Sequence, residues 1–183
     1  NYKKTPLSVM MLSTVLIAAI LGGLYLGYAF NRYKKMAESQ AVQLAESVAS
    51  LIHVEHIEEL SEQADTSDAR LVEESLVDLV EVTDSIYYAY ILKQNDDGSI
   101  TVSIDSSAAD SATSRPTRRN CEETANINKI PFDSGRSLVT QPIKSACGEW
   151  IRALVPIFSI DKKSVIAVFG ISYSADEWNA GLW

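Results

Sequence analysis

The feature that most constrains this chain is an apolar run near its N-terminus, from Pro6 to Phe30. The run contains no Asp, Glu, Lys, Arg or His, and about 20 apolar residues suffice for a helix to cross a bilayer. Such a helix satisfies its backbone polar groups internally, as the membrane interior requires. We predict a short N-terminal flank at residues 1–6 and a transmembrane helix at residues 7–30. Basic residues stand on both sides of the run, at Lys3, Lys4, Arg32, Lys34 and Lys35.

A cleaved signal peptide is the competing interpretation of this run. A signal peptide has an apolar core of about 7–15 residues, followed by a small-x-small cleavage site. The run here is longer, and Gly27-Tyr28-Ala29 matches that site poorly. The sequence therefore favours a retained membrane anchor.

The rest of the chain has the length of one domain, which we place at residues 31–178. All 24 acidic residues follow the apolar run, together with 14 basic residues, which gives residues 31–183 a net charge of −10. An acidic domain is a poor partner for nucleic acid or for an anionic membrane face. We expect residues 179–183 to be a juxtamembrane segment that leads to a second membrane helix beyond this sequence.

The first part of this domain has helical periodicity. Apolar residues recur with helical spacing over residues 41–52 and again over 72–83. No Pro or Gly occurs from Asn31 to Ser85, so the first of these helices can continue the membrane helix as a rod that transmits movement. Ordinary packing of an amphipathic helix on its own domain is compatible with that role.

After Ser85 the pattern changes to that of strands and turns. Strands are predicted at 86–92, 100–104, 137–142, 149–158 and 164–173, with a hairpin signal at Asp97-Gly98 and a helix beginning after Ser174. Residues 106–128 are polar and predict a long loop. The fold class is therefore α+β, an antiparallel sheet of about five strands with the long helix packed on one face. A cleft between the sheet and the long loop is the natural binding site.

Arg152 is the main candidate for binding, because it lies inside an apolar strand and shares one side of it with Trp150. A buried guanidinium needs an anion. That anion is either a ligand carboxylate or a protein partner such as Asp105 or Glu149, and simple exposure of Arg152 is a third possibility.

Tyr88 and Tyr90 share one face of the first strand and could stack on a ligand or hydrogen-bond to it. Core packing is the other interpretation of these two side chains, and it applies equally to Trp150.

The sequence shows no sign of catalysis or of a cofactor. It has no glycine-rich phosphate loop and no Gly-x-Ser-x-Gly motif. His53 and His56 are three residues apart and could face one metal, but this pattern arises easily by chance, and an exposed helix start is favoured. We expect no cofactor, no metal and no catalytic residue.

Two cysteines, Cys121 and Cys147, are too few to define a disulfide framework. They are expected to pair if the domain lies outside the cytoplasm, and to be ordinary thiols if it lies inside.

Several segments together resemble a known family. These are Ile86-Tyr-Tyr-Ala-Tyr-Ile-Leu92 with Asp105-Ser106, then Gly148-Glu-Trp-Ile-Arg-Ala-Leu-Val-Pro-Ile157, then Val165-Ile-Ala-Val-Phe-Gly-Ile-Ser-Tyr173 with Trp178. After a membrane helix and a long amphipathic helix, they resemble the single-Cache (PDC) sensor domains of bacterial histidine kinases, diguanylate cyclases and chemoreceptors. Where the amino-acid-binding members of the family commonly have Asp after Gly-Val, this chain has Ser172.

The resemblance implies a PAS-like sheet on the outer side of a bacterial cell membrane, in a homodimeric signalling receptor that binds a small molecule. An output domain such as a kinase or a diguanylate cyclase would follow in the full-length protein. With the domain outside the cytoplasm, a disulfide between Cys121 and Cys147 is expected. The residues expected to line the pocket are Tyr88, Tyr90, Asp105, Trp150, Arg152 and Ser172.

The sequence leaves two other classes open. An apolar N-terminal helix followed by a sheet also suits a membrane-anchored, pilin-like structural or adhesive subunit, although no Glu lies early in the apolar helix, where subunit assembly would use one. A membrane-tethered enzyme would need a catalytic constellation, and we find none in the sequence.

Overall fold

The computed structural model describes residues 7–52, 57, 67–106, 125–145 and 148–181. The chain forms two compact units, one comprising residues 1–37 and the other residues 38–181. Within the described ranges the helices are α1 (Leu7–Leu51), α3 (Ser67–Val82), α5 (Ala125–Ser134) and α6 (Ala175–Ala180). The strands are β1 (Tyr88–Gln94), β2 (Ile100–Asp105), β3 (Leu138–Val139), β4 (Ile143–Ser145), β5 (Gly148–Phe158) and β6 (Val165–Ser174).

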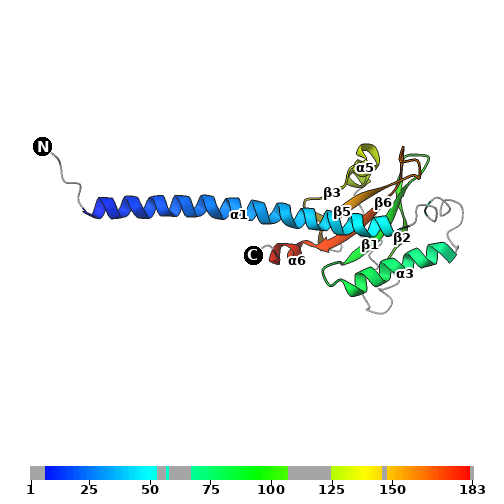
Figure 1. Ribbon diagram of the computed structural model, residues 1–183, viewed down its shortest axis with the longest axis horizontal. Helices are drawn as coiled ribbons and strands as arrows, with labels where there is room; N and C mark the ends of the chain where they lie inside the picture. The colour runs from blue at the N-terminus through cyan, green and yellow to red at the C-terminus, as the bar shows by residue number, and fades with distance from the viewer. Residues whose placement is uncertain (1–6, 53–56, 58–66, 107–124, 146–147, 182–183) are drawn as a thin grey trace. The chain divides into compact units, whose positions relative to one another are not determined.

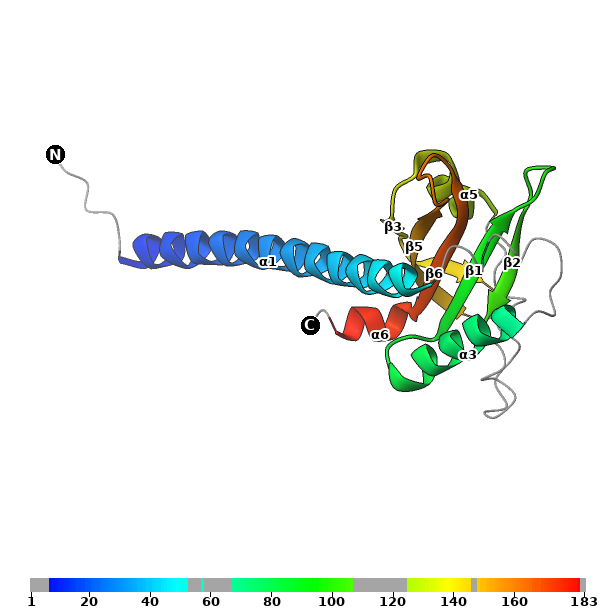
Figure 2. The same cartoon turned by 45° about the vertical axis from the view of Figure 1, so that its right-hand side comes forward.

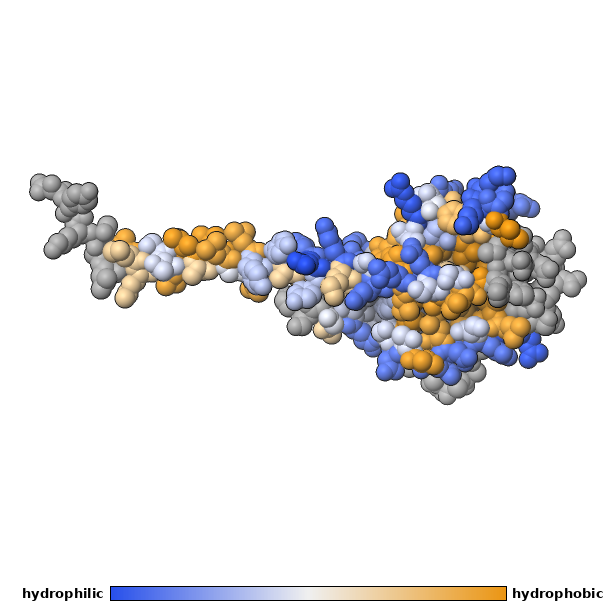
Figure 3. All heavy atoms as spheres, in the orientation of Figure 1, coloured by the Kyte–Doolittle hydropathy of each residue, from blue (hydrophilic) through white to orange (hydrophobic). Residues whose placement is uncertain are grey.

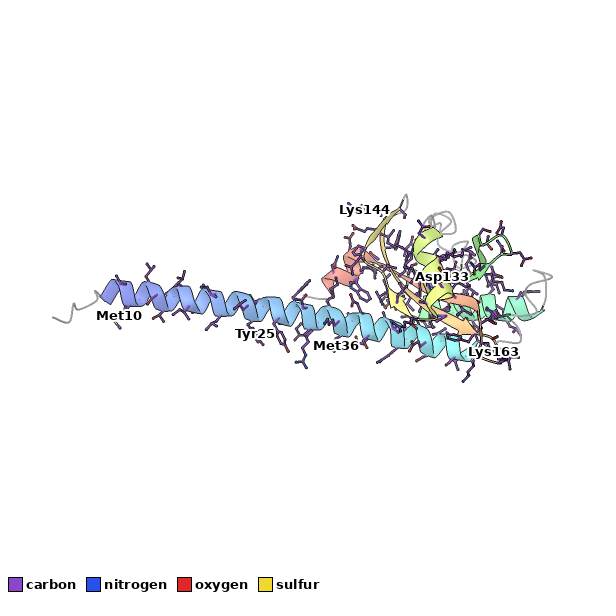
Figure 4. All side chains as sticks on the ribbon, turned by 90° about the horizontal axis from the view of Figure 1, so that it is seen from above. Met10, Tyr25, Met36, Asp133, Lys144 and Lys163 are labelled. Carbon is purple, nitrogen blue, oxygen red and sulfur yellow. The ribbon has the colours of Figure 1, made fainter. Side chains whose placement is uncertain are left out.

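The first unit consists of the N-terminal part of α1. This part of the helix is long and apolar enough to cross a membrane, by its length and composition. Its side chains are exposed from Val9 to Tyr28, and Met10, Tyr25 and Met36 project from the helix (Figure 4). The helix runs without a break from Leu7 to Leu51, so the expectation that the apolar run and the amphipathic segment form one continuous helix is confirmed.

The second unit is built on one antiparallel sheet with the strand order β2-β1-β6-β5-β3, in which β4 also pairs with β5 (Figures 1 and 2). The last long strand, β6, lies in the centre between β1 and β5. Because β6 pairs with the distant strand β1 as well as with the preceding strand β5, residues from the two ends of the domain become cross-strand neighbours. The α+β fold class expected from the sequence is confirmed.

Helices pack against both faces of the sheet (Figures 1 and 2). One face carries Ile91, Phe169 and Ile171 and is packed against apolar side chains of α3 and of the C-terminal end of α1. The opposite face carries Tyr88, Tyr90 and Leu154 and is packed against Ile127 and Phe132 of α5. We call this second surface the α5 face. Alternation along each strand divides its side chains between the two cores.

The structure corrects the expected element list in three places. The sheet has six strands rather than about five, because the three-residue strand β4 is added to β5. The predicted loop at 106–128 ends earlier, since α5 begins at Ala125. The helical cover of the other face comes from α3 as well as from the long helix. The predicted boundaries at residues 30, 31 and 178 stay predictions.

The buried phenol of Tyr173 makes stability depend on pH in alkaline solution. Tyr173 is 6% exposed and packs against Trp178, with ring centroids 5.3 Å apart. Burial raises the pKa of Tyr173 from 10.0 to about 12. The folded state therefore keeps a proton that the unfolded chain releases, and this contribution to stability is lost as the pH rises from about 10 to about 12.

We expect Tyr173→Phe to flatten the decline in unfolding free energy over this range. Urea unfolding at pH 8, 10 and 11.5 gives the unfolding free energy of the variant and of the wild type. The titrations of all other groups cancel in the difference between the two free energies. Parallel pH profiles for the two proteins would contradict the assignment.

Candidate functional site

The predicted pocket residues meet on the α5 face of the sheet. Strand pairing places Ser172 on β6 directly between Tyr88 on β1 and Arg152 on β5. In the neighbouring row, Tyr90 on β1 lies opposite Asp105 on β2 and opposite Gly170 on β6. Five of the six predicted residues thus form two adjacent cross-strand rows that cover four strands.

Every one of the six predicted residues is buried. Arg152 and Asp105 are each 1% exposed, and no predicted pocket residue exceeds 8%. Simple exposure of Arg152 is therefore wrong. A guanidinium and a carboxyl group in the interior both need charged or hydrogen-bonding partners. Either a ligand anion or an internal ion pair can meet that need for Arg152. Glu149, the other carboxylate considered, is exposed.

The backbone of Arg152 is held by Thr140, which precedes β4. The Arg152 amide N–H donates to Thr140 Oγ1 at 3.0 Å, and the Thr140 amide N–H donates to the Arg152 carbonyl oxygen at 2.8 Å. Thr140 is itself buried. These two hydrogen bonds between Thr140 and β5 fix the backbone position from which the Arg152 side chain extends.

The ring of Tyr90 occupies the space above Gly170. A Cβ added at Gly170 would lie 2.4 Å from Tyr90 Cε2 and 2.9 Å from Tyr90 Oη. On the other side, the Tyr88 ring is 5.1 Å from the Tyr90 ring between centroids. A glycine in a strand often marks such a close approach, and here it sets the depth at which the two phenols lie.

Trp150 lies at the start of β5, two residues before Arg152 and on the same face. Its ring lies 4.4 Å from that of Tyr87 between centroids, and its indole N–H donates to Ser145 Oγ at 3.1 Å. Because the polar edge of Trp150 is already bonded within the fold, its contribution to a pocket is an apolar wall. The aromatic-core interpretation and the pocket-wall interpretation are compatible for this residue.

Polar atoms without partners lie on the sheet and on α5. Within the described ranges, Ser172 Oγ and Asn128 Oδ1 make no hydrogen bond, although Ser172 and Asn128 are each 3% exposed. Buried polar groups are normally hydrogen-bonded, so each exception needs a physical explanation. A bound polar molecule between α5 and the sheet would supply the missing partners.

Sequence reasoning missed Tyr87, Asn128, Thr140 and Gly170 as contributors. The polar composition of residues 106–128 predicts a loop at Asn128, and the hydrogen bonds of Thr140 depend on a strand pairing that no local pattern reveals. Gly170 belonged to the segment that carried the family resemblance, but its packing role needed the position of Tyr90. Alternation places Gly170 on the same face as Ser172, but only the pairing of β6 with β1 shows that Tyr90 lies opposite it.

The metal and disulfide hypotheses concern four other residues. His53, His56, Cys121 and Cys147 fall outside the described residues, so the disulfide and the weak metal hypothesis stay predictions. In the part of the chain that the structure describes, no three His, Cys, Asp or Glu side chains gather as a metal site would require.

Comparison with solved structures identifies the fold. The chain is similar to the ligand-binding domain of PctC, an amino acid chemoreceptor of Pseudomonas aeruginosa PAO1 solved with GABA, at 17% identity and a TM-score of 0.51, covering 86% of this chain. It is also similar to the extracellular domain of the histidine kinase soHK1S-Z6, at 12% identity and a TM-score of 0.54, covering 91% of this chain. It spans 66% of each of those two chains.

At these identities the likeness shows the fold alone. The chain has the fold of extracytoplasmic sensor domains, and the resemblance inferred from the sequence is confirmed at this level. No protein-family model and no curated protein matches the chain.

Proposed function

We propose that this chain is the extracytoplasmic sensing part of a membrane signalling receptor, which binds a small molecule on the α5 face of its sheet. The observation that carries the proposal is the row Tyr88–Ser172–Arg152, three polar side chains buried side by side where a purely structural core would be apolar. The sensor-domain fold supports this function over that of a pilin-like subunit.

The chemistry of the face favours a small anionic ligand. Arg152 offers a planar set of donors suited to a carboxylate, and the Ser172 hydroxyl lies beside it. Tyr88 and Tyr90 add apolar ring faces and two phenol groups. Asp105 lies one row away on β2, opposite Tyr90. A monoanion with an apolar or aromatic body fits these residues best.

Signalling follows from the difference in affinity between two conformations of the domain. The unbroken α1 would carry that shift to the membrane, and a homodimer would couple two such helices. The proposal includes this relay through α1, the placement of the domain outside the cytoplasm and the absence of catalysis.

A ligand screen on the fragment spanning residues 35–183 tests the proposal. Both core clusters lie between Ala41 and Trp178, so the fragment keeps the whole described core. At 100 times its dissociation constant, a ligand stabilises the folded state by about 2.7 kcal/mol, which raises the melting temperature by several degrees.

We expect small monocarboxylates to raise the melting temperature and amines of the same size to have no effect. Calorimetric titration of each hit then gives its affinity and stoichiometry. If no member of a broad set of acids, amines and nucleobases stabilises the fragment, a small-molecule sensor is contradicted.

A further inference from the structure

A second surface of the domain forms a groove on the opposite side of the sheet from the α5 face. It lies between the C-terminal end of α1 and α3 and encloses about 510 Å³. Apolar side chains gather over this region of the surface (Figure 3). Three of the lining residues are strongly exposed, with Leu51 at 78%, Leu71 at 60% and Val82 at 84%. A volume of this size is typical of small-molecule sites.

The lining is apolar except at one edge. The polar residues of the groove are Ser75, Asp78 and Thr83, and Ser75 Oγ donates to the Leu71 carbonyl oxygen within α3. Asp78 is exposed and forms no ion pair with any described residue. The groove therefore offers one carboxylate that no described residue pairs with, beside a long apolar wall. The remaining lining residues are Val48, Leu51, Ile52, Leu71, Val72, Leu76, Leu79 and Val82.

A second copy of this chain is a poor occupant on electrostatic grounds. From Glu38 to Leu51, α1 contains two acidic residues and no basic one. Along α3, Arg70 is the one basic residue, against Asp68, Glu73, Glu74, Asp78 and Glu81. Two copies docked groove to groove would bring like charges together, which costs free energy. Charge complementarity requires a positive group on the occupant.

We propose that this groove binds a small cationic amphiphile, with its positive head group beside Asp78 and its hydrocarbon tail along Val48, Leu71 and Leu79. Burial of the tail supplies most of the affinity, and the carboxylate selects the sign of the head group. The site is separate from the one assigned under the proposed function, since no residue of the α5 face lines it.

The test compares three probes with one octyl chain: octyltrimethylammonium, 1-octanol and octanoate. Each probe is titrated calorimetrically into the full chain in lipid nanodiscs. The heat measured with empty nanodiscs is subtracted. The contribution of probe partitioning into lipid is the same for all variants, so it cancels when variants are compared. We expect the cation to bind about tenfold more tightly than octanoate. Asp78→Asn should weaken cation binding about threefold to fivefold and leave octanol binding unchanged.

Matched variants keep the proposal falsifiable. Glu74→Gln removes an equal charge from α3 outside the groove and should change nothing. Ser75→Lys places a positive charge among the lining residues and should weaken cation binding more than Asp78→Asn does. Equal affinities for the three probes, or equal losses in the Asp78 and Glu74 variants, would overturn the proposal.

Two further results would also overturn it. If Arg152→Met abolished cation binding, the probe would occupy the α5 face instead. If Val82→Cys gave a disulfide-linked dimer that no longer bound the probe, the occupant would be a second copy of this chain.

Discussion

Arg152→Met is expected to abolish the stabilisation of the domain by its ligand. The guanidinium is 1% exposed and lies beside Ser172 in the row of buried polar groups. A ligand held by it should lose its full effect, about 2.7 kcal/mol at 100 times the wild-type dissociation constant. Methionine keeps the unbranched apolar stem of the side chain and removes the guanidinium, so the packing of the stem changes little. Thermal and urea unfolding with and without ligand measure the effect.

Lys144→Met is the matched control, because it removes the same charge from an exposed position on β4. It should leave the ligand response intact. The same experiment separates the two remaining roles of Arg152. Loss of about 3–5 kcal/mol in the ligand-free protein, with the ligand response retained, would identify a structural ion pair instead. A double-mutant cycle with Asp105→Asn would then show whether Asp105 is the partner.

Gly170→Ala is expected to destabilise the folded domain by about 1–3 kcal/mol, the usual range for an overpacked core. The added methyl group would meet the Tyr90 ring at 2.4 Å. Tyr90 is fully buried and packed against Tyr88, so its ring can move only by displacing the neighbouring phenol. The ligand affinity should fall together with stability, since both phenols lie on the α5 face. Urea unfolding and ligand titration of the same fragment test both parts.

Gly181→Ala provides the control for the glycine replacement itself. A Cβ at Gly181 would find its nearest neighbours at 3.6 Å, which is ordinary contact. This variant should stay within about 0.5 kcal/mol of wild type. A Gly170→Ala/Tyr90→Leu double variant replaces the opposing ring with a smaller side chain. It should recover part of the stability that Gly170→Ala loses. Additive losses in that double variant would contradict a clash between the two residues.

Local periodicity predicted the side on which the key residues lie. The pairs Tyr88 with Tyr90 and Trp150 with Arg152 share a face because side chains alternate along any strand, whatever its neighbours are. The apolar stripe of Val72, Leu76 and Val80 on α3 was likewise visible as helical spacing, and all three are buried.

Two elements escaped prediction for physical reasons. The helix α5 is short, largely polar and contains Pro131, which argues against a helix in local terms. Strand β4 has three residues, too few for an alternating pattern. Both are held by packing and pairing against β5 and the α5 face rather than by their own propensities.

The sequence by itself determined the apolar helix, the class of fold and the faces of the strands, since each depends on residues that are near one another in the chain. Only the tertiary structure decided that β6 lies between β1 and β5, so that Ser172 stands between Tyr88 and Arg152. It also decided that Gly170 receives the Tyr90 ring and that α1 and α3 leave an apolar groove between them. Strand order and helix packing arise from contacts distant in sequence, which no local period encodes.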